Sequence, residues 1–147
     1  MKSEPTSYSI DDLARDKRTS WNGVRNYQAR NFMKAMAKGD RVLFYHSNTD
    51  PNEVVGVAEV TREAYADDAA LDKKSHYYDP KATKEKPIWE MVDISFVKKF
   101  AVPVTLAQIK RDPRFEGMVL TARGSRLSVQ PVSKPHFDAV LKLGSLK

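Results

Sequence analysis

The 147-residue sequence contains no cysteine. This absence excludes disulfide scaffolds, cysteine-ligated zinc, iron–sulfur clusters and cysteine nucleophiles. The sequence also lacks an apolar run of the roughly 18 residues that a membrane span requires, and its opening residues, MKSEP, are not followed by the apolar stretch of a secretory leader. We therefore expect a cytoplasmic protein with no membrane partner.

The short motifs that commonly carry catalysis are missing as well. The sequence contains neither GxGxxG nor GxxxxGK[ST], and no serine stands in a GxSxG motif. The three histidines, His46, His76 and His136, do not have the spacing with which one helix or hairpin chelates a metal. Residues 48–59 match part of an EF-hand loop, but Glu53 stands where that loop needs glycine. We expect no catalytic residue, no metal and no cofactor.

What the sequence does contain is an excess of basic residues. Lys and Arg number 25 against 19 Asp and Glu, which gives a formal charge of +6. Segment 17–41 alone holds seven bases and a single acid, Asp40. Such an excess attracts polyanions, so nucleic acid is the first partner to test, although a solvated helix face would have the same composition.

The length predicts one domain over residues 1–147, which we expect to be monomeric, because a chain of this size buries about two-thirds of its unfolded surface. Capping and periodicity signals predict helices at 9–16, 26–36, 105–111 and 135–143. Alternating or continuous apolar runs predict strands at 41–47, 53–61, 88–100 and 126–132, with a long polar loop at 66–86. This pattern favours an α+β fold, a small mixed barrel with peripheral helices.

A polar and aromatic segment, WNGVRNYQARN at 21–31, lies inside the basic region. Tryptophan and tyrosine rings can stack on an unpaired base, asparagine and glutamine can read base edges, and arginine pairs with phosphate. The alternative is that Trp21 and Tyr27 are core aromatics. The turn signal Asn22–Gly23 favours a surface position for Trp21, whereas the neighbours of Trp89 begin a strand and favour core packing there.

Seven stretches of the sequence, in order along the whole chain, resemble the EVE domain family and in particular its small bacterial members. They are MKSEP (1–5), YSIDDL (8–13), WNGVRNYQARNFM (21–33), GDRVLFYHSN (39–48), VVGVAEV (54–60), YYDP (77–80) and RLSVQPV (126–132). The resemblance implies a PUA-like fold, a mixed β pseudobarrel with short flanking helices. EVE domains are similar to YTH domains and are regarded as non-catalytic readers of modified bases.

The resemblance also implies a set of ligand-binding residues. These are Ser3, Trp21, Asn22, Asn26, Tyr27, Arg30, Tyr45, His46, Ser47, Arg126 and Ser128. Together with the basic segment, it leads us to expect contacts to the nucleic-acid backbone from Lys2, Arg25 and Lys34.

Three functions remain open at this point. The favoured one is a non-enzymatic reader that binds a modified base, with modified cytosine in DNA ahead of modified RNA. The second is a hydrolase-type enzyme that acts on a modified nucleotide and uses His46 in the same cleft. The third is a sensor of a small molecule or free nucleotide.

Overall fold

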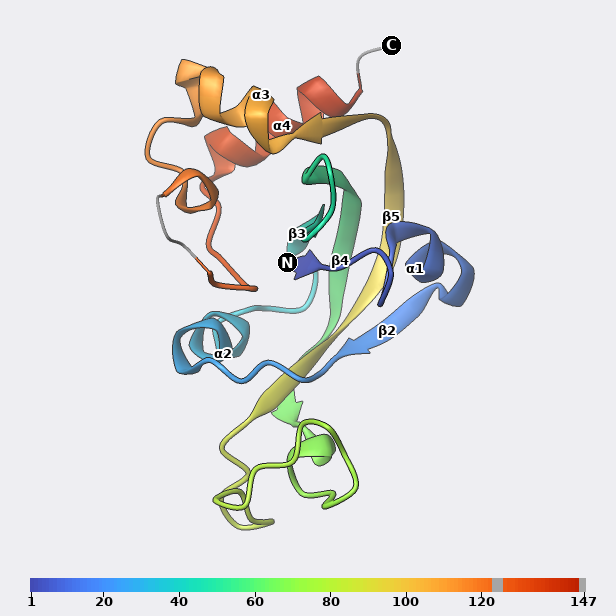
Figure 1. Cartoon of the computed structure of the whole chain (residues 1–147), viewed down its shortest axis with the longest axis vertical. Coiled ribbons are helices and arrows are strands. Elements are labelled where there is room, and N and C mark those ends of the chain that lie inside the picture. The colour runs from blue at the N-terminus through green and yellow to red at the C-terminus, as the bar shows by residue number, and fades with distance from the viewer. Residues whose placement is uncertain (123–125, 146–147) are drawn as a thin grey trace.

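The fold is built around a five-stranded mixed sheet (Figure 1). The computed structural model describes residues 1–122 and 126–145. The strands are β1 (Lys2–Ser3), β2 (Arg18–Trp21), β3 (Arg41–His46), β4 (Glu53–Ala66) and β5 (Glu90–Thr105). The helices are α1 (Ile10–Asp16), α2 (Tyr27–Lys34), α3 (Leu106–Arg111) and α4 (Lys134–Gly144), with 3₁₀ turns η1 (Asp68–Ala70), η2 (Pro113–Phe115) and η3 (Val119–Thr121).

The strand order is β1-β3-β4-β5-β2, so β1 and β2 form the two edges of the sheet. β1 runs parallel to β3, and the remaining pairs are antiparallel. The register between β4 and β5 shifts at several places, and such bulges bend and twist a strand pair. The predicted α+β class, with short helices around a mixed sheet, is confirmed. The sheet stays open within the described ranges.

Side-chain caps begin α1, α2 and α3 where the sequence predicts them. Ser9 and Asp12 form a capping box at α1, and Thr105 and Gln108 form another at α3. Asn26 accepts a hydrogen bond from the backbone of Ala29 and so starts α2. Each cap satisfies backbone N–H groups that the first helical turn leaves without partners.

β3 lies between two hydrophobic clusters, which explains its apolar character on both faces. Val42 and Phe44 belong to the cluster under α1 and α2, whereas Leu43 and Tyr45 belong to the cluster under α3 and α4. A third, smaller cluster contains Trp89, which is only 5% exposed, so the predicted core role of this indole is confirmed.

Two parts of the predicted strand pattern are wrong. Residues 126–132 form no strand; the segment passes β1 with the Lys2 amide donating to the Ser128 carbonyl, while Val129 is buried in the first cluster. β2 was not expected because its sequence, RTSW, is short and largely polar. No helix in the described part of the chain is long and apolar enough to cross a membrane.

Candidate functional site

A surface groove with a volume of about 660 Å³ lies between the N-terminal segment, β2 with the residues after it, and the long loop 67–89. Its lining consists of Lys2, Ser3, Glu4, Ser7, Tyr8, Thr19, Ser20, Trp21, Asn22, Gly23, Val24, Arg25, His76, Tyr77 and Ser128. Sites for small ligands commonly measure about 300 to 1,000 Å³. The groove is therefore large enough for one nucleotide.

Trp21 contributes both to this groove and to the core. It is partly buried at the end of β2, opposite Val92 of β5. Its ring meets Phe44 edge-on, with centroids 5.6 Å apart, and it packs against the first hydrophobic cluster. The core thus fixes one part of the indole while another part lines the groove.

The asparagines of segment 21–31 have separate roles. Asn26 caps α2, and the side-chain oxygen of Asn31 accepts two hydrogen bonds from Arg30. Asn22 is exposed in the groove, and its side-chain amide bonds to none of the described residues. Asn22 therefore keeps both a donor and an acceptor for a ligand.

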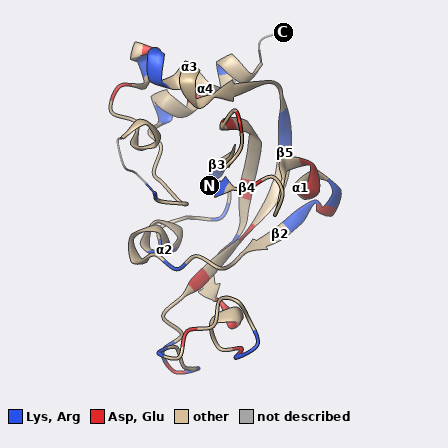
Figure 2. Cartoon of the chain, in the orientation of Figure 1, with Lys and Arg blue, Asp and Glu red and all other residues tan. Residues whose placement is uncertain are grey.

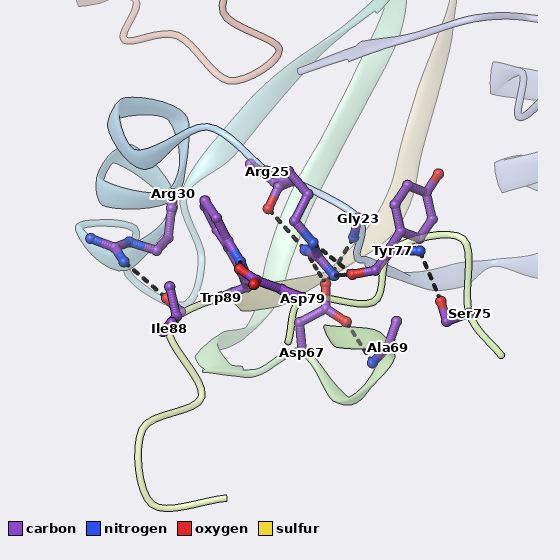
Figure 3. Close-up of polar contacts among 11 residues, drawn as sticks. Gly23, Arg25, Arg30, Asp67, Ala69, Ser75, Tyr77, Asp79, Ile88 and Trp89 are labelled. Atoms are coloured by element: carbon purple, nitrogen blue, oxygen red, sulfur yellow. Dashed lines mark hydrogen bonds and ion pairs between the residues drawn. The ribbon is translucent and has the colours of Figure 1, made fainter. Parts of the chain in front are cut away.

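A buried carboxylate joins the groove to the long loop (Figure 3). Asp67 is 1% exposed and accepts from the Gly23 amide at 2.8 Å and from Arg25 Nη1 at 3.0 Å. Its other oxygen accepts from Ala69 and caps η1. A buried carboxylate with a cationic partner and several donors is well satisfied, so this contact fixes the backbone on both sides.

Arg25 extends the same connection to Tyr77. Its Nε and Nη2 donate to the Tyr77 carbonyl at 3.0 and 2.8 Å, and its guanidinium lies 5.5 Å from the centroids of both the Tyr77 and Trp89 rings. These bonds place the Tyr77 ring beside Gly23 at the groove. Arg25 thus uses its donors to position the loop.

A second aromatic pair lies outside the groove. Tyr27, at 56% exposure, stacks on Trp89 with centroids 4.8 Å apart, and Trp89 Nε1 donates to Asp79 at 2.7 Å. Arg30 lies over the Tyr27 ring and donates to the Ile88 carbonyl. Tyr27 and Arg30 therefore attach α2 to the end of the long loop.

The family model described as "EVE domain" matches residues 1–143. The chain belongs to the EVE domain family. Human thymocyte nuclear protein 1 is 40% identical over 162 residues, which cover 97% of this chain and 72% of the relative.

Two solved structures are similar to this EVE domain over nearly its whole length. A hypothetical protein from Leishmania major is 53% identical with a TM-score of 0.92, and the match covers 98% of this chain and 91% of that one. Human THYN1 in complex with 5-methylcytosine-containing DNA is 37% identical with a TM-score of 0.93, and the match covers 100% and 96%.

This EVE domain brings together only part of the predicted site. The groove contains Lys2, Ser3, Trp21, Asn22, Arg25 and Ser128. The other predicted residues do not line the groove. Those on α2 or its cap are Asn26, Tyr27, Arg30 and Lys34, and those at the end of β3 are Tyr45, His46 and Ser47. Arg126 is exposed elsewhere. Sequence reasoning missed Thr19, Ser20, His76 and Tyr77 as lining residues. The signals for Tyr77 were the tyrosines in a polar loop and the YYDP stretch that resembles the family.

The end of β3 has structural contacts of its own. His46 Nε2 accepts from the Ile10 amide at 3.1 Å, and burial lowers the pKa of this imidazole below 6.5, with a smaller opposing effect from Asp11. Tyr45 is buried in the second cluster, and the Ser47 amide donates to the Ser3 carbonyl. The neutral imidazole thus serves as an acceptor at the start of α1.

The basic segment is less positive in the fold than in the sequence. Arg25 pairs with Asp67, Lys34 with Glu90 at 3.5 Å, and Arg41 with Glu59 at 3.8 Å. The three acids come from residues 51–100, where Asp and Glu outnumber Lys and Arg by ten to eight. Lys and Arg are spread over the fold (Figure 2). At the groove, Lys2 remains as a cation, and partial burial lowers its pKa.

Proposed function

We propose that this EVE domain binds DNA that carries a modified cytosine and holds the modified base in the groove beside Trp21. The observation that carries the proposal is the human relative THYN1, which is similar to this chain over its whole length and whose structure contains 5-methylcytosine DNA. The groove supports it with a partly buried indole, a free asparagine amide and a volume that suits one nucleotide.

The physical requirement is that the groove offsets the free energy of base extrusion. Taking a base out of a duplex costs a few kcal/mol. Stacking on an aromatic ring contributes about 1 to 3 kcal/mol per base, and hydrogen bonds to the base edge add discrimination. Trp21 supplies the ring, and Asn22 supplies a donor and an acceptor.

We infer a binding function without catalysis. A nucleophile and its base must lie within hydrogen-bond reach of each other. In the described part of the groove no serine hydroxyl bonds to a histidine, and the Ser3 hydroxyl donates to the Tyr8 carbonyl. His46, the candidate base of the enzymatic alternative, lies outside the groove and accepts from Ile10.

The test is a titration of the protein with matched oligonucleotides at one salt concentration. DNA of one sequence carries either 5-methylcytosine or cytosine at a single position, and an RNA of the same sequence is the third probe. We expect the methylated DNA to bind most tightly and to be recovered with unchanged mass. Equal affinity for the two DNAs would contradict the reader function, and conversion of the methylated base would favour the enzyme.

A further inference from the structure

A second hollow lies next to the groove, with a volume of about 520 Å³. We call it the arginine pocket; its lining consists of Arg18, Thr19, Ser20, Thr61, Arg62 and Asp93. Thr19 and Ser20 also line the groove, so the two hollows meet at β2. In the described part of the chain, β2 is an edge strand whose one partner is β5. A bound nucleic-acid strand could therefore pass from one hollow to the other around the free edge of β2.

The strand register puts Ser20, Asp93 and Arg62 of the arginine pocket on one face of the sheet. Ser20 lies opposite Asp93 on β5, and Asp93 lies opposite Arg62 on β4. Directly opposed residues project from the same face, so these side chains form a row. Trp21 is adjacent to Ser20 in β2 and therefore projects from the other face, toward the first hydrophobic cluster.

Arg62 is held in place before any ligand arrives. Its guanidinium lies 3.5 Å from the centroid of the Tyr65 ring. The Tyr65 hydroxyl donates to Asp93 and lies 3.1 Å from the Ser20 hydroxyl, which fixes the ring. A guanidinium fixed by stacking on an aromatic face loses less conformational freedom when it binds an anion.

The donors of both arginines are unused. Neither the Arg18 nor the Arg62 guanidinium makes an ion pair or donates a hydrogen bond within the described ranges, and both residues are exposed. The one carboxylate of the pocket, Asp93, accepts from Tyr65 and opposes part of the positive charge. Two free guanidinium groups on one surface are a donor set that binds phosphate.

We propose that Arg18 and Arg62 bind a backbone phosphate of the DNA strand, at a linkage next to the nucleotide whose base enters the groove. This assignment rests on the proposed function of the groove. Because both residues contact the backbone, the pocket positions the strand and does not distinguish methylated from unmethylated cytosine. Arg18 was counted in the basic segment of the sequence, whereas Arg62 follows from the fold alone.

The test uses Arg18→Gln and Arg62→Gln with the 5-methylcytosine and cytosine DNAs over a range of salt concentrations. We expect each variant to weaken both DNAs by the same factor. Because the two arginines share one phosphate, the Arg18→Gln, Arg62→Gln double variant should reduce the slope of log affinity against log salt by about one unit. Lys110→Ala and Lys142→Ala, on α3 and α4 away from β2 (Figure 1), are the controls and should leave the slope unchanged. Melting temperatures confirm that each variant is folded.

A scan with neutral methylphosphonate linkages identifies the phosphate. We expect one linkage beside the 5-methylcytosine at which neutralisation weakens the parent protein but has no further effect on the Arg18→Gln, Arg62→Gln double variant. Equal losses of affinity in the parent and the double variant at every linkage would overturn the phosphate-binding role of the arginine pocket. If the parent protein still preferred methylated DNA, that result would leave the proposed function of the groove intact. Equal binding of both DNAs by the parent would overturn the groove function first.

Discussion

Gly23 and Tyr77 touch so closely that no side chain fits between them. A Cβ placed on Gly23 would lie 2.6 Å from the Tyr77 ring, and the backbone of Gly23 has a φ of +80°. The contact joins the turn after Trp21 to a loop residue 54 positions further along the chain. Asp67 supports it, because this carboxylate accepts hydrogen bonds from both the Gly23 amide and Arg25. It sets the position of one wall of the groove.

The first prediction is that Gly23→Ala lowers affinity for methylated DNA. The added methyl group displaces the Tyr77 ring, and the positive φ contributes about 1 to 2 kcal/mol of strain. Gly117→Ala is the matched control, because Gly117 has a φ of +83° and open space around its Cβ position. Thermal melts should show a lower melting temperature for both variants, because both carry the backbone strain. Titrations should show weaker DNA binding only for Gly23→Ala. Equal affinities for the two variants would show that the Tyr77 wall is not used.

The second prediction concerns the buried carboxylate of Asp67. Asp67→Ala leaves Arg25 without an acidic partner and should reduce the free energy of unfolding by about 3 to 5 kcal/mol. Asp67→Asn keeps the shape and should lose less, about 1 to 3 kcal/mol. Asp68→Asn, at the exposed neighbouring position, should stay within about 0.5 kcal/mol of the parent. Denaturant unfolding measures all three, and an Asp67→Ala variant as stable as Asp68→Asn would refute the role of this contact.

The third prediction is a pH dependence of stability from His46. Burial, followed by a weaker contribution from Lys99, lowers the pKa of His46 below 6.5, and Asp11 acts in the opposite direction. As the pH falls below 6.5, His46 therefore becomes protonated more readily in the unfolded chain than in the folded protein. The free energy of unfolding should decrease as the pH falls from about 6.5 toward the lower pKa of the folded state. His46→Gln retains an acceptor for the Ile10 amide and should flatten the dependence. Identical pH profiles of unfolding in parent and variant would contradict the assignment.

The fourth prediction concerns Thr61, whose hydroxyl is buried without a hydrogen-bond partner in the described part of the chain. Thr61→Val replaces this unpaired group with a methyl of similar shape and should stabilise the protein by about 1 kcal/mol. Thr61→Ser keeps the hydroxyl and is expected to be less stable than the parent. A loss of stability in Thr61→Val, seen in chemical denaturation, would mean that the hydroxyl has a partner after all.

Local signals in the sequence were sufficient for most elements of the fold. The caps at Ser9, Asn26 and Thr105 predict the starts of three helices, and the apolar run at 41–47 predicts a strand buried on both faces. β2 has no such signal, because its pairing with β5 depends on residues more than 70 positions away. The apolar pattern of 126–132 is explained by the buried Val129 and the partly buried Leu127, which pack against the first cluster without strand pairing.

The candidate site was harder to predict because one short segment divides between two locations. Trp21 and Asn22 line the groove. Asn26 caps α2, and this helix places Tyr27 and Arg30 next to Trp89 instead. The sequence gives the composition of the segment but not the point at which the chain changes direction. Tyr77 was missed for a related reason, since its position depends on the long-range bonds of Arg25.

The most direct measurement is the affinity of Trp21→Ala for DNA with a single 5-methylcytosine, compared with the parent protein at one salt concentration. Loss of the stacking surface should weaken binding by about 1 to 3 kcal/mol, or roughly 5-fold to 150-fold. Because the ring is only partly buried, the stability loss should stay below the roughly 3 to 5 kcal/mol of a buried tryptophan. Parent-like affinity in a folded Trp21→Ala protein would show that the base does not bind beside Trp21.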